Sequence, residues 1–227
     1  MIDIQFKKKY FNLLFLVVFI CTVNTSCRGE GTNVSNGSLL DVNSDILNVK
    51  SFGAKGDGKT DDTKALQTAL DEGAGKTIFL PKGNYIVSRS LYITSGTEIK
   101  GEGDVGNEAG SAIFPKSDFT FAIFTARSNK LSDVIFRNIR TMKAKYSLSI
   151  NVKGGYLTKV KWYNCVFQEH EICINVIGSK TEGMYANTFR DCYFKASGLG
   201  TYCEGPFNIN IIQGFGFENM YDGYIKL

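Results

Sequence analysis

The sequence predicts an all-β fold, a single-stranded right-handed parallel β-helix with a short N-terminal capping α-helix. Three observations favour this fold. Short apolar segments alternate with turn residues in a chain that contains 24 glycines and 3 prolines. An aromatic-X-Asx motif recurs at a nearly constant interval in the second half of the chain. Near the first of these apolar segments, a group of apolar residues has the spacing of one face of a helix.

The N-terminus has the layout of a secretory signal. Lys7, Lys8 and Lys9 precede an apolar run over residues 11–23. This run is shorter than the roughly 20 apolar residues that a membrane-spanning helix needs. An uncleaved anchor and a buried helix are the alternatives.

The residues after this run resemble the cleavage box of bacterial lipoproteins, in which the cysteine becomes the lipid-bearing N-terminus. Asn24-Thr25-Ser26 precede Cys27, and Asn24 stands where that family has an aliphatic residue. We therefore expect a signal peptide over 1–26, lipidation of Cys27 and a polar linker over 27–45. The resemblance implies an exported outer-membrane or cell-surface lipoprotein; the alternative is a periplasmic or secreted protein.

The charge balance argues against a nucleic-acid partner. The formal net charge is +4, and removal of residues 1–26 takes away three lysines and Asp3 and leaves +2. A surplus this small does not predict binding to a polyanionic backbone.

We expect the folded domain to cover residues 46–227, with a cap over about 46–103 and coils over about 104–227. A helix is predicted from one apolar stripe, formed by Ala65, Leu66, Ala69 and Leu70. Thr60 is the predicted N-cap, Asp61 and Asp62 oppose the positive end of the helix, and Gly73 ends it. The alternative role for the two aspartates is general acid and base catalysis. Strands are predicted at Thr77–Leu80, Tyr85–Val87, Leu91–Ile93 and Glu98–Lys100.

The cap also resembles a known family. The relevant motifs are Phe52-Gly53-Ala54, Gly56-Asp57-Gly58, Asp61-Asp62-Thr63, Gln67, Leu80-Pro81, Gly83, Tyr85 and Gly101-Glu102-Gly103. Together they are similar to the N-terminal signature of the pectate lyase superfamily, which includes polygalacturonase-like and rhamnogalacturonase-like enzymes and phage tailspikes. The resemblance covers about residues 47–103 and implies the parallel β-helix and a polysaccharide substrate.

An internal repeat supports the coils independently. The motif occurs at Phe136-Arg137-Asn138, Trp162-Tyr163-Asn164, Phe189-Arg190-Asp191 and Phe217-Glu218-Asn219, with its Asx residues 26, 27 and 28 positions apart. Stacked coils bury an apolar face that one coil cannot bury alone, so we expect the four aromatics to form one internal column. The Asx residues are expected at or beside a turn.

Four cysteines lie in the predicted coils, namely Cys165, Cys173, Cys192 and Cys203. They show no CxxC spacing, so no zinc site is predicted. Cys165 and Cys192 follow the repeat at the same offset and are expected in adjacent coils, either as a reduced apolar pair or as a disulfide.

The chemistry of polysaccharide cleavage limits which residues are useful. Hydrolysis needs two carboxyl groups across the sugar, whereas a lyase needs a base and a group that neutralises the uronate carboxylate, often calcium. In a β-helix such partners project from adjacent coils, about 26 residues apart in sequence. The Asn-Thr-Asp, Gly-His-Gly and Arg-Ile-Lys pieces of polygalacturonase-like enzymes are missing from usable places, so that mechanism transfers to no residue here.

The densest ionisable cluster is Glu169-His170-Glu171, a candidate catalytic or calcium-binding patch whose alternative is a solvated turn. Lys143 and Lys145 are candidates for contacting a uronate chain, with an exposed loop as the alternative. Tyr146, Trp162, Tyr163, Tyr185 and Tyr202 have the ring for stacking on sugars. Ladder positions favour the core, so only Tyr163 and Tyr185 are kept as candidates.

Together with the signal-like N-terminus, the resemblance to the pectate lyase superfamily implies an exported polysaccharide-degrading protein that acts on a pectin-like acidic glycan, with hydrolase or lyase chemistry undecided. No cofactor is predicted, apart from calcium if the chemistry is that of a lyase. A non-catalytic surface glycan-binding β-helix and an inactive N-terminal fragment of an enzyme are the alternatives. The fragment alternative arises because residues 222–227 have the pattern of a new coil and no capping repeat follows.

Overall fold

The computed structural model describes residues 45–103, 109–208, 210–214, 216–220 and 223–226. All of them belong to one compact unit, Asp41–Leu227. The expected signal peptide, Cys27 and nearly all of the linker lie outside the described residues. Within the described part, no helix is long and apolar enough to cross a membrane.

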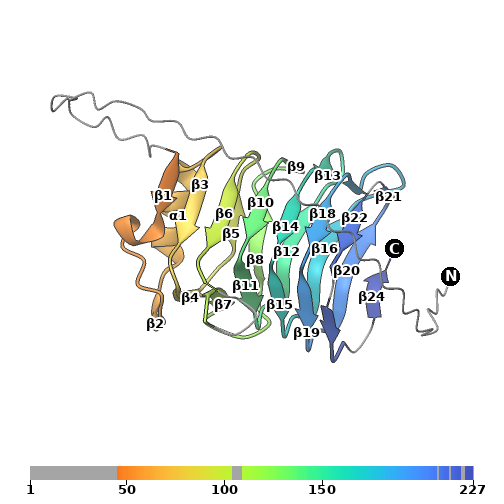
Figure 1. The fold of residues 1–227 in the computed structure, drawn as a ribbon. Helices are drawn as coiled ribbons and strands as arrows, with labels where there is room; N and C mark the ends of the chain where they lie inside the picture. The colour runs from red at the N-terminus through yellow and green to blue at the C-terminus, as the bar shows by residue number, and fades with distance from the viewer. Residues whose placement is uncertain (1–44, 104–108, 209, 215, 221–222, 227) are drawn as a thin grey trace, which may run out of the picture. The chain divides into compact units, whose positions relative to one another are not determined.

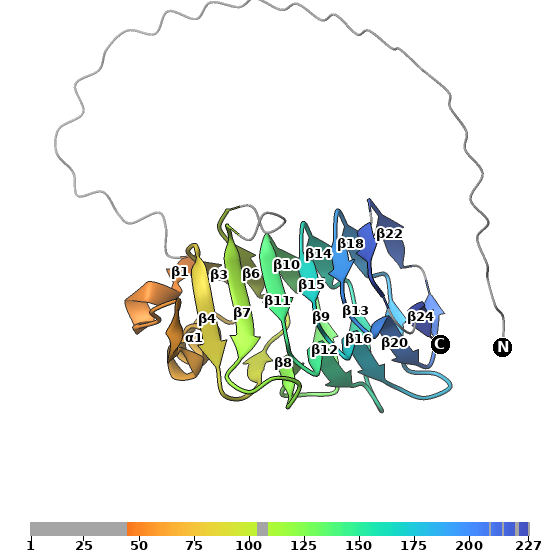
Figure 2. The same ribbon diagram turned by 90° about the horizontal axis from the view of Figure 1, so that it is seen from below.

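The described chain forms a parallel β-solenoid of four sheets, which Figures 1 and 2 show from two directions. Neighbouring strands of a sheet come from successive coils. Sheet A contains β1 (Ile46–Asn48), β3 (Thr77–Leu80), β6 (Glu98–Gly101), β10 (Ile135–Arg137), β14 (Lys161–Tyr163), β18 (Thr188–Arg190) and β22 (Ile211–Gln213). Sheet B contains β2 (Asp57–Asp61), β4 (Gly83–Val87), β7 (Ser111–Pro115), β11 (Ile139–Met142), β15 (Val166–Gln168), β19 (Tyr193–Lys195) and β23 (Gly216–Glu218).

Sheets C and D complete each coil. Sheet C contains β5 (Leu91–Ile93), β8 (Ala122–Ala126), β12 (Tyr146–Asn151), β16 (Ile172–Ile177), β20 (Leu199–Glu204) and β24 (Gly223–Lys226). Sheet D contains β9 (Lys130–Ser132), β13 (Tyr156–Thr158), β17 (Met184–Tyr185) and β21 (Phe207–Asn208). The strands predicted in the cap are confirmed as β3, β4, β5 and β6. The right-handed winding stays a prediction.

The helix α1 (Thr63–Glu72) follows β2 and buries the predicted apolar stripe, with Leu66, Ala69 and Leu70 inside. The predicted N-cap is wrong, because Thr60 lies within β2 and Asp62 occupies the N-cap position. The Asp62 carboxylate makes no cap bond and instead accepts hydrogen bonds from the N–H groups of Lys55 and Gly56. That carboxylate therefore holds the preceding glycine-rich loop. Gly73 ends the helix as predicted, and its N–H donates to Ala69.

Three of the four predicted column members stack in register. Phe136 pairs with Trp162, and Trp162 pairs with Phe189, on adjacent strands of sheet A. Their rings are nearly parallel, with centroids 5.7 Å and 4.3 Å apart. All three side chains are buried. The stacked coils thus form one continuous apolar interior, as the repeat predicts.

The fourth member was assigned wrongly. Ile212, not Phe217, pairs with Phe189 in sheet A, and Phe217 pairs with Phe194 in sheet B. The last coil is shorter because two residues join β20 to β21, whereas six join β16 to β17. A shortening of four residues moves the next aromatic motif on to the following sheet.

The turns between sheets A and B confirm the Asx prediction for three residues. Asn138, Asn164 and Asp191 all have positive φ angles near 50°, a conformation that Asn and Asp tolerate better than most residues. The Asn164 amide also donates to the Asn138 side chain at 3.0 Å. Asn219 also confirms the prediction, because it has the same conformation in the turn after β23 that leads from sheet B.

The four coil cysteines are free and buried. Cys165 and Cys192 lie in adjacent coils, because the N–H of Tyr193 donates to the carbonyl of Cys165 at 2.9 Å. The Cys192 thiol donates to the carbonyl of Trp162. The reduced alternative therefore holds for this pair.

Candidate functional site

The outer face of sheet C carries a groove of about 670 Å³, which runs over β12, β16 and β20. Its lining residues are Tyr146, Glu171, Ile172, Asn175, Ile177, Leu199, Tyr202 and Glu204. The lining thus combines two tyrosines, an amide, two carboxylates and three aliphatic side chains. Such a lining fits a sugar ring, which presents both C–H faces and hydroxyl groups.

The register of sheet C explains why residues so distant in sequence meet. Tyr146, Ile172 and Leu199 form one row across the three strands. A second row contains Asn175 and Tyr202, which are directly paired. Residues separated by about one coil therefore share one face of the sheet.

Two of the lining side chains, those of Asn175 and Tyr146, make contacts with neighbouring residues. The Asn175 side chain is 5% exposed, and its amide donates to the Ser149 hydroxyl at 2.9 Å. The ammonium group of Lys145 lies 5.5 Å from the ring centroid of Tyr146. Lys145, a candidate from the sequence, is therefore at the edge of the groove.

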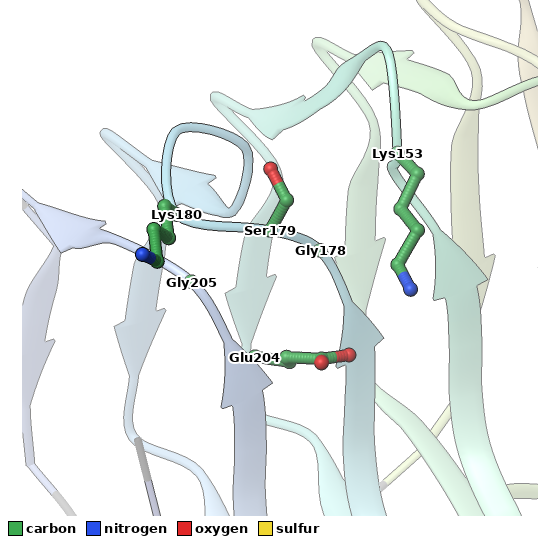
Figure 3. Close-up of a pocket in the computed structure, with 6 residues that line it drawn as sticks. All are labelled: Lys153, Gly178, Ser179, Lys180, Glu204 and Gly205. Atoms are coloured by element: carbon green, nitrogen blue, oxygen red, sulfur yellow. The ribbon is translucent and has the colours of Figure 1, made fainter.

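A second depression of about 450 Å³ adjoins the groove, because Glu204 lines both. Lys153 comes from the turn after β12, and Lys180 from the loop after β16. Figure 3 shows Lys153 extending from its turn toward the level of the Glu204 carboxylate, with Lys180 on the loop above Gly205. Two lysines and one glutamate therefore line the same depression at the end of the groove.

The loop over residues 178–183 is tightly built. The Ser179 hydroxyl donates to the Glu182 carboxylate, and the Tyr185 hydroxyl donates to the carbonyl of Thr181 at 2.6 Å. A Cβ atom at Gly178 would lie 1.9 Å from the carbonyl oxygen of Glu182. Only glycine fits there, so the wall of the second depression has a fixed position.

The structure separates the three members of the predicted ionisable cluster. His170 is 2% exposed, its Nδ1 lies 3.0 Å from the carbonyl oxygen of Ala144, and its Nε2 lies 3.1 Å from the Thr141 hydroxyl. Burial lowers the pKa of His170 to about 4, although hydrogen bonds to these two residues oppose the shift. A buried, neutral imidazole fills a structural role and is not exposed to a polysaccharide on the surface. Of the cluster, Glu171 alone lines the groove.

The remaining sequence candidates lie elsewhere on the coils. Lys143 and Glu169 occupy equivalent positive-φ turn positions after β11 and β15. Tyr163 is on the outward face of sheet A, and Tyr185 is in sheet D. These residues are not brought together with the groove, and their predicted roles stay predictions.

The two groove carboxylates stand far apart. Glu171 precedes Ile172, which pairs with Leu199, whereas Glu204 pairs with Ile177. Their backbone positions are therefore offset by six residues along the strands, or about 20 Å. Glycoside hydrolysis requires carboxyl groups roughly 5–10 Å apart. These two residues do not form such a pair.

Sequence reasoning missed several residues of this site, among them two tyrosines, Glu204 and two lysines. Tyr146 and Tyr202 were set aside as core aromatics, but both are half-buried on the outer face. Glu204 and its neighbouring cations carry no local motif, because they come from three different coils. The register of sheet C was the missing information.

Comparisons with known proteins identify a family that the N-terminal coils resemble. Residues 46–123 match the sequence model of a family described as rhamnogalacturonase A/epimerase, pectate lyase-like. The resemblance to the pectate lyase superfamily is thereby confirmed for the N-terminal coils.

Two curated relatives illustrate how short the matches are. The chain is 50% identical over 66 residues to alginate lyase 7 of Azotobacter vinelandii, covering 25% of this chain and 8% of the relative. It is 31% identical over 139 residues to a capsule K30/K69-specific depolymerase of Klebsiella phage K5-2, covering 61% of this chain and 16% of the relative. The chain thus matches less than a fifth of the length of these relatives.

Among solved structures, the A-module of mannuronan C-5 epimerase AlgE6 of Azotobacter vinelandii aligns with a TM-score of 0.41 and 17% sequence identity. The alignment covers 75% of this chain and 57% of that chain.

Proposed function

We propose that this chain is an exported, polysaccharide-degrading β-helix that takes an acidic, pectin-like glycan across the outer face of sheet C. The observation that carries the proposal is the groove with Tyr146 and Tyr202 on its walls, which continues into a depression flanked by Lys153 and Lys180. Tyrosine rings stack on sugar faces, and lysine side chains neutralise uronate carboxylates. The names of the relatives, an alginate lyase and a capsule depolymerase, support a polysaccharide substrate.

The geometry favours lyase chemistry over hydrolysis. A lyase removes the proton beside the uronate carboxylate, and the electron pair left behind forms a C=C double bond as the glycosidic C–O bond breaks. The leaving oxygen takes a proton from water. The step requires one base and a cation that neutralises the uronate carboxylate. We assign Glu204 as the base and Lys153 as the cation that contacts the substrate. Hydrolysis would instead use two facing carboxyl groups, which Glu171 and Glu204 do not provide.

Calcium does not fit the described residues well. No group of three or more His, Cys, Asp or Glu side chains within them is arranged to hold a metal ion. Calcium prefers several oxygen ligands, and Glu204 contributes one side chain in a depression with two lysines. We therefore route no step through a metal.

The separation of the Glu171 and Glu204 carboxylates also favours a second function, that of a surface glycan-binding protein without catalysis. The groove would then retain the glycan at the surface without turnover. Glu204 and the lysines would in that case contribute to binding alone. Saturable retention of a polysaccharide without product over long incubation is the distinguishing result.

Polygalacturonate and alginate are suitable probes to separate these functions. Lyase activity predicts unsaturated products that absorb in the ultraviolet, and Glu204→Gln should abolish them. Glu218→Gln, an exposed carboxylate of sheet B that pairs with Lys195, is the matched control and should keep them. Reducing ends without ultraviolet absorbance would contradict the lyase assignment. Saturable retention of the glycan without any product would contradict catalysis and support the binding function.

We also propose lipidation of Cys27 and surface localisation, supported by the signal-like segment in the sequence. Labelling of cells with a radioactive fatty acid should mark the wild-type protein and not a Cys27→Ser variant. Label on both proteins, or on neither, would contradict the lipid anchor.

We further propose that α1 caps the N-terminal end of the apolar interior. Its Leu66 and Leu70 lie with Ile78, Leu80 and Leu91 around a small internal space. Leu66→Ala should therefore lower the free energy of unfolding by about 2–5 kcal/mol. An unchanged unfolding midpoint in urea would contradict this role.

A further inference from the structure

The outer face of sheet A carries a row of cations that the groove does not use. Lys100, Arg137, Tyr163 and Arg190 occupy paired positions on β6, β10, β14 and β18. These strands lie side by side in Figure 1. Lys161 adds a fourth cation in the neighbouring row of the same face. We call Lys100, Arg137, Lys161, Tyr163 and Arg190 the sheet A strip.

The outer face of sheet A carries an excess of positive charge. Glu98 is the single acidic residue at the outward positions of β6, β10, β14 and β18, and its carboxylate pairs with Arg137 at 3.1 Å. Three further cations therefore share the face with one acid that is already ion-paired. The small net charge of the whole chain does not reveal this local excess.

Both guanidinium groups of the strip contact the ring of Tyr163. Arg137 lies 4.7 Å and Arg190 lies 5.9 Å from the ring centroid of Tyr163, one from each neighbouring strand. Directly beneath them, Phe136, Trp162 and Phe189 form the buried column. The backbone of the strip is thereby supported from within, and the contacts with Tyr163 favour an arrangement in which both guanidinium groups lie close to one ring.

Strand spacing gives the strip its period. Adjacent strands are separated by about 4.8 Å, so Arg137 and Arg190 stand about 10 Å apart. The strip runs across the strands, along the axis on which the coils stack. It is therefore matched to an extended chain that carries anionic groups at intervals.

We propose that the sheet A strip is a second binding surface, separate from the groove of sheet C, for an extended polysaccharide that bears carboxylate or sulfate groups. Planar guanidinium groups pair with such oxyanions through two hydrogen bonds. The strip would retain a long glycan while the groove on another sheet holds a different segment. It does not depend on the groove being catalytic.

Two other polyanions fit the strip less well. Single-stranded nucleic acids are bound by basic grooves with open aromatic faces, but arginines flank the Tyr163 ring on both sides. A membrane surface favours an apolar face that enters the lipid, whereas Ile135 is the one aliphatic residue at the outward positions of these four strands.

The test uses the full chain and a triple variant, Lys100→Gln, Lys161→Gln and Arg190→Gln, which leaves the Arg137–Glu98 pair intact. Lys55→Gln, Lys59→Gln and Lys64→Gln form the matched control, because these exposed residues remove the same charge from outside sheet A. Heparin and polygalacturonate are the sulfated and carboxylated probes. Circular dichroism and urea unfolding check that both variants fold.

The strip variant should bind at least one of these probes on the order of tenfold more weakly, with a reduced dependence of the affinity on salt. The control should stay close to the wild type. Equal weakening in both variants would show a net-charge effect and overturn the proposal. Tighter binding of phosphatidylglycerol vesicles or single-stranded DNA than of both glycans would overturn the assigned partner.

This design distinguishes a failure of the groove proposal from a failure of the strip proposal. A Tyr202→Ala variant alters the groove without touching sheet A. If Tyr202→Ala abolishes binding while the strip variant binds normally, the strip proposal is wrong and the groove survives. If the strip variant loses binding but still forms the groove's products from short oligosaccharides, the strip proposal stands.

Discussion

The indole ring of Trp162 lies on the ring of Phe189 in the next coil, with centroids 4.3 Å apart and planes 4° from parallel. Both side chains are buried, and Phe136 continues the stack on the other side of Trp162. This contact joins three coils through one column of aromatic side chains. The sheets outside the column, and therefore the groove and the strip, depend on that stacking.

Removal of the central ring should destabilise the solenoid strongly. Trp162→Ala leaves a cavity between Phe136 and Phe189 and should lower the free energy of unfolding by about 3–5 kcal/mol. Tyr193→Ala, which truncates an exposed aromatic, should cost less than about 1 kcal/mol. Urea unfolding followed by circular dichroism measures both values. Similar costs for the two variants would contradict the central role of the column.

Asn187 should contribute through its hydrogen bonds, because its side chain is fully buried between coils. Its Oδ1 accepts from the N–H of Val160 at 2.9 Å, and its amide donates to the carbonyl of Leu157 and to Asn210. Asn187→Ala leaves these groups unsatisfied and should cost about 1–3 kcal/mol. Asn208→Ala, on the exposed end of sheet D, should change stability little, and equal losses would argue against the bridging role.

The stability of the protein should fall below neutral pH because of His170. Burial holds the pKa of His170 near 4 in the folded state, against 6.5 ordinarily. The unfolded chain therefore binds more protons between these values, and stability decreases as the pH falls from about 7 toward 4. From pH 7 to pH 5 the wild type should lose about 2 kcal/mol more than His170→Gln. Parallel pH profiles for the two proteins would contradict the buried neutral imidazole.

Cys165 and Cys192 should remain reduced and unreactive in the native protein. Burial raises the pKa of the Cys165 thiol, and both side chains are inaccessible to solvent. Native alkylation followed by peptide mass spectrometry should leave both unmodified, and denaturation without reductant should make both react. Recovery of a Cys165–Cys192 disulfide peptide would contradict this expectation.

The sequence was most informative where one coil repeats another without insertion. The register of Phe136, Trp162 and Phe189 follows from equal spacing, and the Asx turns follow from residues that tolerate positive φ. Phe217 was assigned to the wrong sheet because β20 and β21 are joined by only two residues. Hydrophobic periodicity alone does not locate such a shortening.

The site was harder to predict than the fold. Glu171 and Lys145 were found from local charge, but Tyr202 and Glu204 become recognisable only once β20 is placed beside β16. His170 resembled a surface acid–base group because its neighbours are glutamates. Its burial follows from the packing of the turn between β15 and β16, which the sequence does not specify.

The central claim is that the outer face of sheet C binds an acidic polysaccharide, and equilibrium titration with polygalacturonate tests it most directly. The wild type should bind saturably, Tyr202→Ala should weaken the affinity roughly three- to tenfold, and Tyr193→Ala on sheet B should leave it unchanged. Wild-type affinity in Tyr202→Ala, or an equal loss in Tyr193→Ala, would contradict the account.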